Sequence, residues 1–361
     1  MKIAEQRTAS TAAGHILGRF RPRRVPLLAG ALAATAAVAT AGCSALGGTN
    51  AAGHAYESVT LSGSTTSNSA PIANGKAGGY QVLTLNDRRD ITFNQLLGIN
   101  NEGVIAGYFG SGNAGHPNKG YQLRPPFAQG DFGSENVPGS AQTQVTGLND
   151  LGVSVGFFST QNGATPAADN NVGFWTAHGR YHQVSYPTRD NAKPAVNQLL
   201  GINDTGTAVG FYNDSAGNAH GYAYNINTRR FKLITVPGAT SLTATAVNIW
   251  GTVAGFYTNA KGTVDAFLRY HSNKVTTLAV PGASMTQAFG LNDDNEVVGT
   301  YATGTGNNAV THGFTWENGK FTTVNFPQAS STTINGVNNE GDIVGFYTDA
   351  AGNTDGFVGL P

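Results

Sequence analysis

The feature that most constrains this chain is a pattern that occurs six times between Gly79 and Pro361. Each copy contains an apolar residue followed by asparagine, and the asparagines are spaced by 49, 54, 45, 44 and 46 residues. The six pairs are Ile99-Asn100, Leu148-Asn149, Ile202-Asn203, Val247-Asn248, Leu291-Asn292 and Val337-Asn338. A period of this length indicates repeated copies of one small structural unit, so the unit is interpreted first.

Each unit holds four short apolar segments separated by turn residues. After the asparagine comes a segment such as VGFY at 344–347, then a glycine–aromatic pair such as GF at 356–357, then a segment that ends at proline, as at 321–327. The segments are rich in Val, Phe, Tyr and Thr and are too short for helices, so we expect strands. Four strands in about 40–50 residues are typical of a propeller blade.

The two ends of the repeat array complement each other. The sixth copy stops at Pro361, after its third segment, whereas an extra segment at 80–85 precedes the first copy and resembles a fourth strand. If the early strand completes the last blade, no sheet edge is left unpaired. The sequence therefore predicts an all-β fold over residues 79–361: a six-bladed β-propeller of four-stranded blades, closed by the N-terminal strand.

In each of the six repeats, the second strand carries glycine at one fixed place, as at Gly156 and Gly345. Glycine weakens a strand interior, so its use implies that another group approaches closely. We expect an aromatic side chain of the adjacent blade to fill this space.

The first 42 residues have the composition of an export signal. Six basic residues lie before an uncharged, mostly Ala, Val and Leu stretch at 25–41, and small residues follow. This order of charge, apolar run and small residues is typical of a signal peptide. We therefore assign 1–42 to an export signal and 43–78, rich in Ser, Gly, Thr and Asn, to a flexible tether.

Two modes of signal cleavage are consistent with these residues. Thr40-Ala41-Gly42-Cys43 resembles a lipobox, in which Cys43 would be acylated, although Thr40 departs from the usual Leu or Val. Residues 39–41 also fit an ordinary A-x-A cut. The chain's only cysteine, Cys43, lies at the one place where a lipobox needs it, which favours the lipoprotein over the ordinary cut. We expect an exported protein, either lipid-anchored at the bacterial cell envelope or secreted.

The repeat resembles the HAF-repeat family of bacterial extracellular proteins. The resemblance rests on the G-[IL]-N anchors, the VGFY strands and the third strands that begin HGY at 220–222 and HGF at 312–314. It covers nearly all of residues 79–361. The family implies an exported repeat protein and brings no catalytic residues with it.

Charge excludes one class of partner. From Cys43 onward the chain has 15 basic and 20 acidic residues, a net charge of −5. Such a protein lacks the basic surface of nucleic-acid binding proteins. We expect a monomer that meets a membrane only through its N-terminal lipid anchor.

Catalytic and metal signatures are weak. GVSVG at 152–156 matches GxSxG, and GSGNAG at 110–115 matches GxGxxG, but both lie among strands without the helix these sites need. No histidine pattern predicts a transition-metal site. Asp349, Asn353 and Asp355 could bind calcium through loop oxygens, although these residue types also form ordinary turns. We expect no other cofactor.

Loop length provides the remaining functional signal. From the second-strand aromatic residue to that of the third strand, repeats three, four and six span 10 residues, whereas repeats one, five and two span 12, 13 and 16. Insertions on one face of a repeat protein often mark a binding face, although neutral loop drift also produces them. The candidate residues there are His116, Asn118, Asn162, Asp169, Asn170, Asn307 and Asn308.

Three functions are consistent with these features. The first is a non-catalytic binding module that takes a ligand or partner, such as an extracellular polysaccharide or a surface protein, on the long-loop face. The second is an extracellular hydrolase or lyase with a site at the channel mouth, for which only His116, Asp169 and Asp190 break the repeat symmetry. The third is a purely structural surface protein. The sequence favours the first, because propeller fold alone does not imply catalysis.

Overall fold

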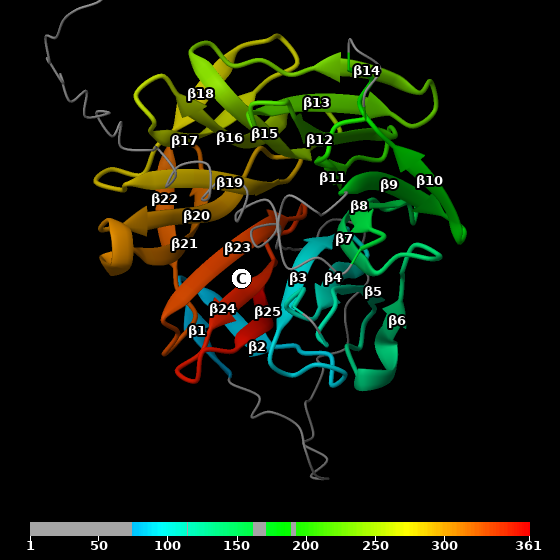
Figure 1. Ribbon diagram of the computed structural model, residues 1–361. Coiled ribbons are helices and arrows are strands. Elements are labelled where there is room, and N and C mark those ends of the chain that lie inside the picture. The colour runs from blue at the N-terminus through cyan, green and yellow to red at the C-terminus, as the bar shows by residue number, and fades with distance from the viewer. Residues whose placement is uncertain (1–73, 114, 162–170, 189–192) are drawn as a thin grey trace, which may run out of the picture.

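The structure is a computed structural model that describes residues 74–113, 115–161, 171–188 and 193–361 (Figure 1). These residues form antiparallel β-sheets, and the helical turns among them are two short 3-10 segments, η1 (Gln129–Asp131) and η2 (Gly306–Asn308). Within these ranges, no helix has the length and apolar character needed to cross a membrane. The all-β prediction is therefore confirmed for the described part of the chain. Cys43 and the predicted signal lie outside it, as does most of the predicted tether.

Three sheets contain four strands each, in the order of the predicted units. The first consists of β3 (Asn94–Ile99), β4 (Ile105–Phe109), β5 (Lys119–Leu123) and β6 (Phe132–Ser134). The second consists of β7 (Gln142–Leu148), β8 (Ser154–Ser159), β9 (Val172–Ala177) and β10 (Arg180–Val184). The third consists of β11 (Asn197–Ile202), β12 (Thr207–Asn213), β13 (Ala219–Asn225) and β14 (Arg230–Leu233).

An eight-stranded sheet follows, built from two such groups. One group is β15 (Ala239–Val247), β16 (Val253–Asn259), β17 (Val264–Arg269) and β18 (Val275–Leu278). The other is β19 (Met285–Leu291), β20 (Val297–Thr303), β21 (Val310–Glu317) and β22 (Lys320–Val324). The two groups are joined through a parallel pairing of Val264 with Met285, at the start of β17 and β19.

The last sheet combines both ends of the described chain. It contains β23 (Ser331–Val337), β24 (Ile343–Thr348) and β25 (Thr354–Leu360), followed by β2 (Tyr80–Thr84) and β1 (Asn74–Ala77). β2 pairs with β25 from Gln81↔Leu360 to Thr84↔Phe357, so it lies where the sixth repeat lacks a fourth strand. The sheet begins at Asn74, within the range assigned to the tether, because β1 pairs with β2 along its whole length.

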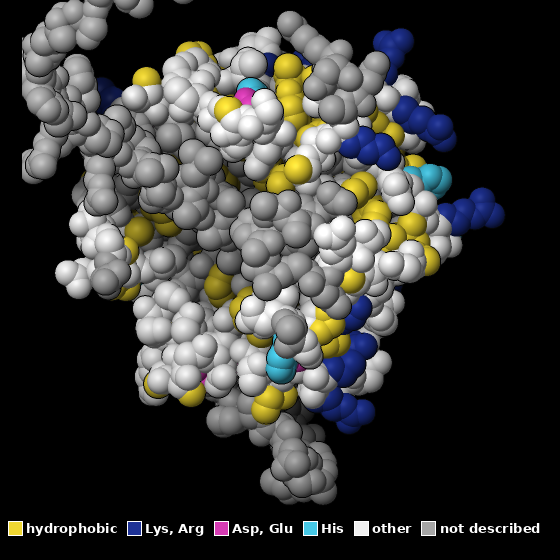
Figure 2. Space-filling model, in the orientation of Figure 1, with side chains coloured by type: hydrophobic (Ala, Val, Ile, Leu, Met, Phe, Trp, Pro, Cys, Tyr) yellow, Lys and Arg dark blue, Asp and Glu magenta, His cyan; other side chains and the backbone are white. Residues whose placement is uncertain are grey.

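The sheets follow one another in chain order around a common centre, and β1 and β2 lie beside β25 (Figure 1). The hydrophobic core fills the spaces between successive sheets. Val155 of β8, for example, packs in one cluster with Leu199 of β11 and Tyr222 of β13, all fully buried. On the face shown in Figure 2, Lys and Arg side chains gather along the right-hand side, over the region of the outer strands β14, β10 and β6.

The innermost strands approach one another at their backbones. Each of β3, β7, β11, β15, β19 and β23 carries a register shift three residues before its end, which is a β-bulge. A Cβ atom at Gly290, in the bulge of β19, would lie 2.0 Å from the Cα atom of Gly336 in β23. This close approach brings the ends of the first strands together at the centre.

Glycine is needed in the second strand of each unit for a different reason from the one predicted. A Cβ atom at Gly156 would lie 2.1 Å from the carbonyl oxygen of Gln144 and 2.9 Å from the ring of Phe174. Phe174 is paired with Gly156 in the same sheet, so the expectation of an aromatic residue from the adjacent blade was wrong. The glycine instead lets the ring lie flat across its own sheet, beside the bulged first strand.

Candidate functional site

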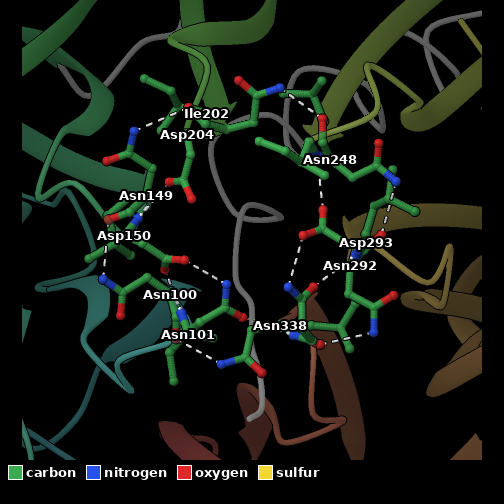
Figure 3. A pocket seen from close by; sticks show the side chains of 18 residues that line it. Asn100, Asn101, Asn149, Asp150, Ile202, Asp204, Asn248, Asn292, Asp293 and Asn338 are labelled. Atoms are coloured by element: carbon green, nitrogen blue, oxygen red, sulfur yellow. Dashed lines mark hydrogen bonds between the residues drawn. The ribbon is translucent and has the colours of Figure 1, made fainter. Parts of the chain in front are cut away.

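The ends of the six first strands enclose a hollow at the centre of the molecule. It has an empty volume of about 430 Å³ and is lined by the last residue of each strand and the two residues that follow it (Figure 3). We call it the channel mouth. Its polar lining consists of Asn100, Asn101, Asn149, Asp150, Asn203, Asp204, Asn248, Asn292, Asp293, Asn338 and Asn339.

The six repeat asparagines form a closed ring of hydrogen bonds at the channel mouth. The Nδ2 atom of each donates to the backbone carbonyl oxygen of the next, at 2.8–3.1 Å. The donors, in order, are Asn100, Asn149, Asn203, Asn248, Asn292 and Asn338, and Asn338 donates back to Asn100. All six are buried, and the ring gives each of their side-chain amides a hydrogen-bond acceptor.

The same asparagines also fold their own turns. In the first sheet, Oδ1 of Asn100 accepts from the backbone N–H groups of Glu102 at 3.1 Å and Val104 at 2.9 Å. One side chain thus donates to the neighbouring unit and accepts within its own. Aspartate could not replace asparagine here, because an ionised carboxylate has no proton to donate. This explains the recurrence of asparagine at one place in every repeat.

A second ring is formed by the residue after each asparagine, and it is interrupted. The backbone N–H of this residue donates to the side chain of its counterpart in the next unit at 2.7–3.0 Å; the donor–acceptor pairs are Asn101–Asp150, Asp150–Asp204, Ile249–Asp293, Asp293–Asn339 and Asn339–Asn101. Ile249 has no side-chain acceptor, so the second ring is broken between Asp204 and Ile249. The channel mouth therefore departs from sixfold symmetry at one place.

The channel mouth is acidic. Asp150, Asp204 and Asp293 surround the hollow (Figure 3), and the described part of the chain contributes no Lys or Arg to its lining. Burial, together with the neighbouring charge of Asp150, raises the pKa of Asp204. These carboxylates repel anions and can accept hydrogen bonds from hydroxyl or ammonium groups. The part of the chain that the structure describes has no group of three or more His, Cys, Asp or Glu placed to hold a metal ion.

An exposed tryptophan lies beside the break in the second ring. Trp250 follows Ile249 and is 67% exposed, and its Nε1 atom donates to the backbone carbonyl oxygen of Asp293 at 3.0 Å. The hydrogen bond orients a large apolar ring at the rim of the channel mouth. Leu151, 66% exposed, occupies the corresponding place in the second unit. Exposed tryptophans on proteins often mark binding surfaces.

Those residues predicted from loop length that the structure describes lie at the other ends of the strands. Of these, His116 is accessible, with 56% of its side chain exposed, and its Nδ1 atom lies 2.7 Å from Oδ2 of Asp90. Asn118 is buried: it donates to the Gly110 carbonyl at 2.6 Å and accepts from Gln144 at 2.8 Å.

The other predicted residues are dispersed or not described. Asn307 and Asn308 belong to η2, where Asn308 is exposed. Asn162, Asp169 and Asn170 lie outside the described residues, as do Cys43 and Asp190. Of the predicted residues that the structure describes, none is at the channel mouth. The sequence signal that could have located the channel mouth is the set of repeat asparagines, because each is followed directly by another residue of its lining.

The loop proposed for calcium is held by its own hydrogen bonds. Oδ1 of Asp349 accepts from the backbone N–H groups of Ala351 and Asn353 at 2.8 Å, and Oδ2 accepts from the Asn353 side chain at 2.9 Å. Asp355 accepts instead from Nδ2 of Asn86 at 2.6 Å. Calcium binding at this loop stays a prediction, and these contacts are those of an ordinary turn.

Comparison with protein-family models finds no match, and comparison with curated proteins finds none either. Among solved structures, the chain is similar to a mutant of AofleA from Arthrobotrys oligospora, with 10% identity, 77% of this chain and 86% of that chain covered, and a TM-score of 0.46. It is also similar to the beta-propeller domain of the trilobed protease from Pyrococcus furiosus (8%, 74% and 95%, TM-score 0.41). A third is a mutant of the Aleuria aurantia lectin AAL in complex with Fucα1-6GlcNAc (10%, 74% and 93%, TM-score 0.43). These likenesses concern the overall fold, and the site is argued from its own residues.

Proposed function

We propose that the chain is a closed six-bladed β-propeller that acts as a non-catalytic binding module for extracellular polysaccharide. Six blades are obtained if the eight-stranded sheet counts as two, at its parallel pairing of Val264 with Met285. Two observations support closure: β2 pairs with β25, and the hydrogen bond from Asn338 to Asn100 joins the last unit to the first. A closed ring is a rigid scaffold on which a site can be held.

The observation that carries the binding proposal is the break in the second ring beside Trp250. There, an exposed indole adjoins a hollow lined by carboxylates and amides. Sugars present C–H groups on one face and hydroxyls around the edge, so they match an aromatic surface next to hydrogen-bonding side chains. Asp150, Asp204 and Asp293 disfavour anionic polymers, so the ligand is a neutral or cationic saccharide.

The test compares two exposed residues at equivalent places. Titration of the protein with a panel of neutral bacterial and plant polysaccharides should identify a ligand, and Trp250→Ala should weaken its binding at least about tenfold, or 1.4 kcal/mol. Leu151→Ala is the matched control and should leave affinity within about twofold. Equal affinity of Trp250→Ala and wild type, or no binding by any polysaccharide, would contradict the proposal.

We also propose that the protein is exported and belongs with the HAF-repeat proteins. The N-terminal composition supports export, and the repeat pattern supports the family. Metabolic labelling with a radiolabelled fatty acid separates the two cleavage modes. Label that is lost in Cys43→Ala would support a lipid anchor, whereas an unlabelled, secreted product would support ordinary cleavage.

One observation favours hydrolysis as a second candidate function. Asp150 and Asp204 lie on neighbouring turns of the channel mouth, and burial and the charge of Asp150 raise the pKa of Asp204. A carboxyl with a raised pKa beside a second carboxyl is an arrangement used in general acid–base catalysis. This function predicts release of reducing ends from a bound polysaccharide, with a loss of at least about 100-fold in Asp204→Asn. If a polysaccharide binds but no reducing ends are released, the protein is a binding module and not a hydrolase.

A further inference from the structure

A second pocket lies between the third unit and the start of the fourth, away from the channel mouth. Its empty volume is about 450 Å³. It is bounded by the beginning of β13, the end of β14 with the residues that follow, and the beginning of β15, which lie side by side (Figure 1). The channel mouth is formed instead by the end of β15. We call this second space the His220 pocket.

His220 is held rigidly in the wall of this pocket. Its Nε2 atom lies 2.8 Å from Oδ2 of Asp214, and its ring stacks on Tyr212 at 5.1 Å and 24°. Burial acts against the ionised form of Asp214, but hydrogen bonds from His220, Asn218 and Ala216 hold the pKa of this carboxyl below its usual value. Because an ionised carboxylate only accepts, Nε2 carries the proton. Nδ1 is then the acceptor of the neutral ring.

The equivalent histidine of the fifth unit shows what is special about His220. His312 also stacks on a tyrosine, Tyr301, at 5.0 Å and 29°. However, its Nδ1 atom is bonded to the side chain of Asn325 at 3.1 Å. In the third unit the residue at the place of Asn325 is Thr235, and Nδ1 of His220 has no hydrogen-bond partner among the described residues. Nδ1 of His220 in the third unit is therefore available to a ligand, whereas Nδ1 of His312 in the fifth unit is bonded to Asn325.

The remaining lining defines the chemistry of a ligand. The Ser241 hydroxyl accepts from the backbone N–H of Ala219 at 3.0 Å, so its proton is free to be donated. Leu233, 45% exposed, and buried Leu242 supply apolar surface. Among the described residues that line the pocket there is no Lys, Arg, Asp or Glu. A fitting ligand is neutral, small and bears hydroxyl groups around an apolar ring face.

We propose that the His220 pocket binds a single neutral sugar residue, independently of the channel mouth. Nδ1 of His220 accepts from one hydroxyl, the Ser241 hydroxyl donates to another, and the C–H face of the ring packs on Leu233 and Leu242. The proposal extends the function beyond the channel mouth and does not depend on it. Two separate sites on one chain would let the protein hold a polysaccharide at two points.

The experiment uses individual sugars and a substitution that copies the fifth unit. Glucose, galactose, mannose, fucose and N-acetylglucosamine are tested by saturation-transfer NMR and then by calorimetry, up to about 50 mM, because single-sugar affinities near 1 mM correspond to only about −4 kcal/mol. Thr235→Asn should place an amide on Nδ1 of His220 and weaken binding at least about tenfold. Thr235 is exposed, so the variant should fold.

Two controls make the outcome specific. His220→Ala should weaken binding as Thr235→Asn does, whereas His312→Ala should leave it unchanged. Absence of saturable binding by every sugar, or equal affinity in wild type and Thr235→Asn, would overturn the proposal. Loss of binding in Trp250→Ala alone would place the sugar at the channel mouth instead. If no polysaccharide binds at the channel mouth but single sugars still bind to the wild type and not to His220→Ala, the His220 pocket is a site of its own.

Discussion

The side-chain amide of Asn338 donates a hydrogen bond of 2.8 Å to the backbone carbonyl oxygen of Asn100, a residue 238 positions away. It joins the last repeat to the first, and five equivalent bonds join the other neighbours. The ring thus links every unit to the next at the centre of the molecule, where the first strands end.

Asn338→Ala is expected to destabilise the protein by about 1–3 kcal/mol, because the Asn100 carbonyl keeps only its bond from the Gly103 N–H and the N–H of Glu340 loses its side-chain acceptor. For a domain of this size, that corresponds to a loss of about 2–4 °C in Tm per kcal/mol. Thermal unfolding followed by circular dichroism measures it. Asn308→Ala, at an exposed asparagine, is the control, and equal Tm values for the two variants would contradict a structural role of the ring.

Deletion of residues 79–87 removes β2, including buried Tyr80 and Val82, and exposes the edge of β25. We expect the deletion to lower the Tm of the whole domain by more than about 10 °C, because several buried side chains and a row of strand hydrogen bonds are lost together. Deleting β1 alone, which pairs with β2 at the sheet's outer edge, should cost less. A truncated chain that melts like the intact one would show that β2 does not close the fold.

Gly290→Ala should destabilise the centre of the molecule, because the new Cβ atom would meet the backbone of Gly336 at 2.0 Å. Overpacking of this kind costs about 1–3 kcal/mol. Gly133→Ala is a matched strand control, since its nearest contact is 3.6 Å, and it should be nearly neutral. Chemical denaturation of both variants measures the difference, and equal stabilities would argue against the close approach of β19 and β23.

Asn118 and His116 were both predicted to bind ligand, and their replacement by Ala should have very different effects on stability. Asn118→Ala removes buried hydrogen bonds to Gly110 and Gln144 and should cost about 1–3 kcal/mol of stability. His116→Ala removes a half-exposed ring from Asp90, whose carboxylate keeps its hydrogen bonds from Thr92, so a cost of about 1 kcal/mol or less is expected. Melting curves distinguish them. A ligand effect confined to His116→Ala would support the long-loop face as a binding surface.

Stability should fall as the pH rises from mildly acidic to mildly alkaline. Burial, helped by the charge of Glu317, raises the pKa of Glu296 to about 7, above its ordinary value of 4.5. The folded state therefore binds this proton more tightly than the unfolded chain. Its contribution is fully present below the unfolded value of 4.5 and is lost as the pH rises through about 7. Asp342, whose pKa burial also raises to about 7, acts in the same direction.

Glu296→Gln should remove part of this fall, because the amide stays neutral. The expected gain at about pH 8 is on the order of 1 kcal/mol after allowance for solvent screening, and none is expected near pH 4. Melting temperatures measured across this range test it, with exposed Glu102→Gln as the control. A constant offset at every pH would mean that packing, and not protonation, causes the change.

Much of the architecture can be predicted from the sequence alone. The alternation of Val, Phe and Tyr with turn residues acts within a few neighbouring positions, so it predicts strands and the four-stranded unit without reference to the rest of the fold. The same local pattern identified an extra strand at 80–85, which pairs with β25. The repeat asparagines were visible in the same way, although their mutual hydrogen bonds were not.

Only the tertiary structure decided where the functional groups meet. Ile249 is an ordinary apolar residue in the sequence, and it matters because six turns converge and its neighbours, Asp204 and Asp293, carry side-chain acceptors. The open Nδ1 of His220 likewise depends on a residue in another strand, Thr235. Loop length pointed to the opposite ends of the strands, because the length of a loop reflects only whether the fold tolerates an insertion at that loop. Convergence at an axis depends on how all the sheets pack, and no local pattern encodes that.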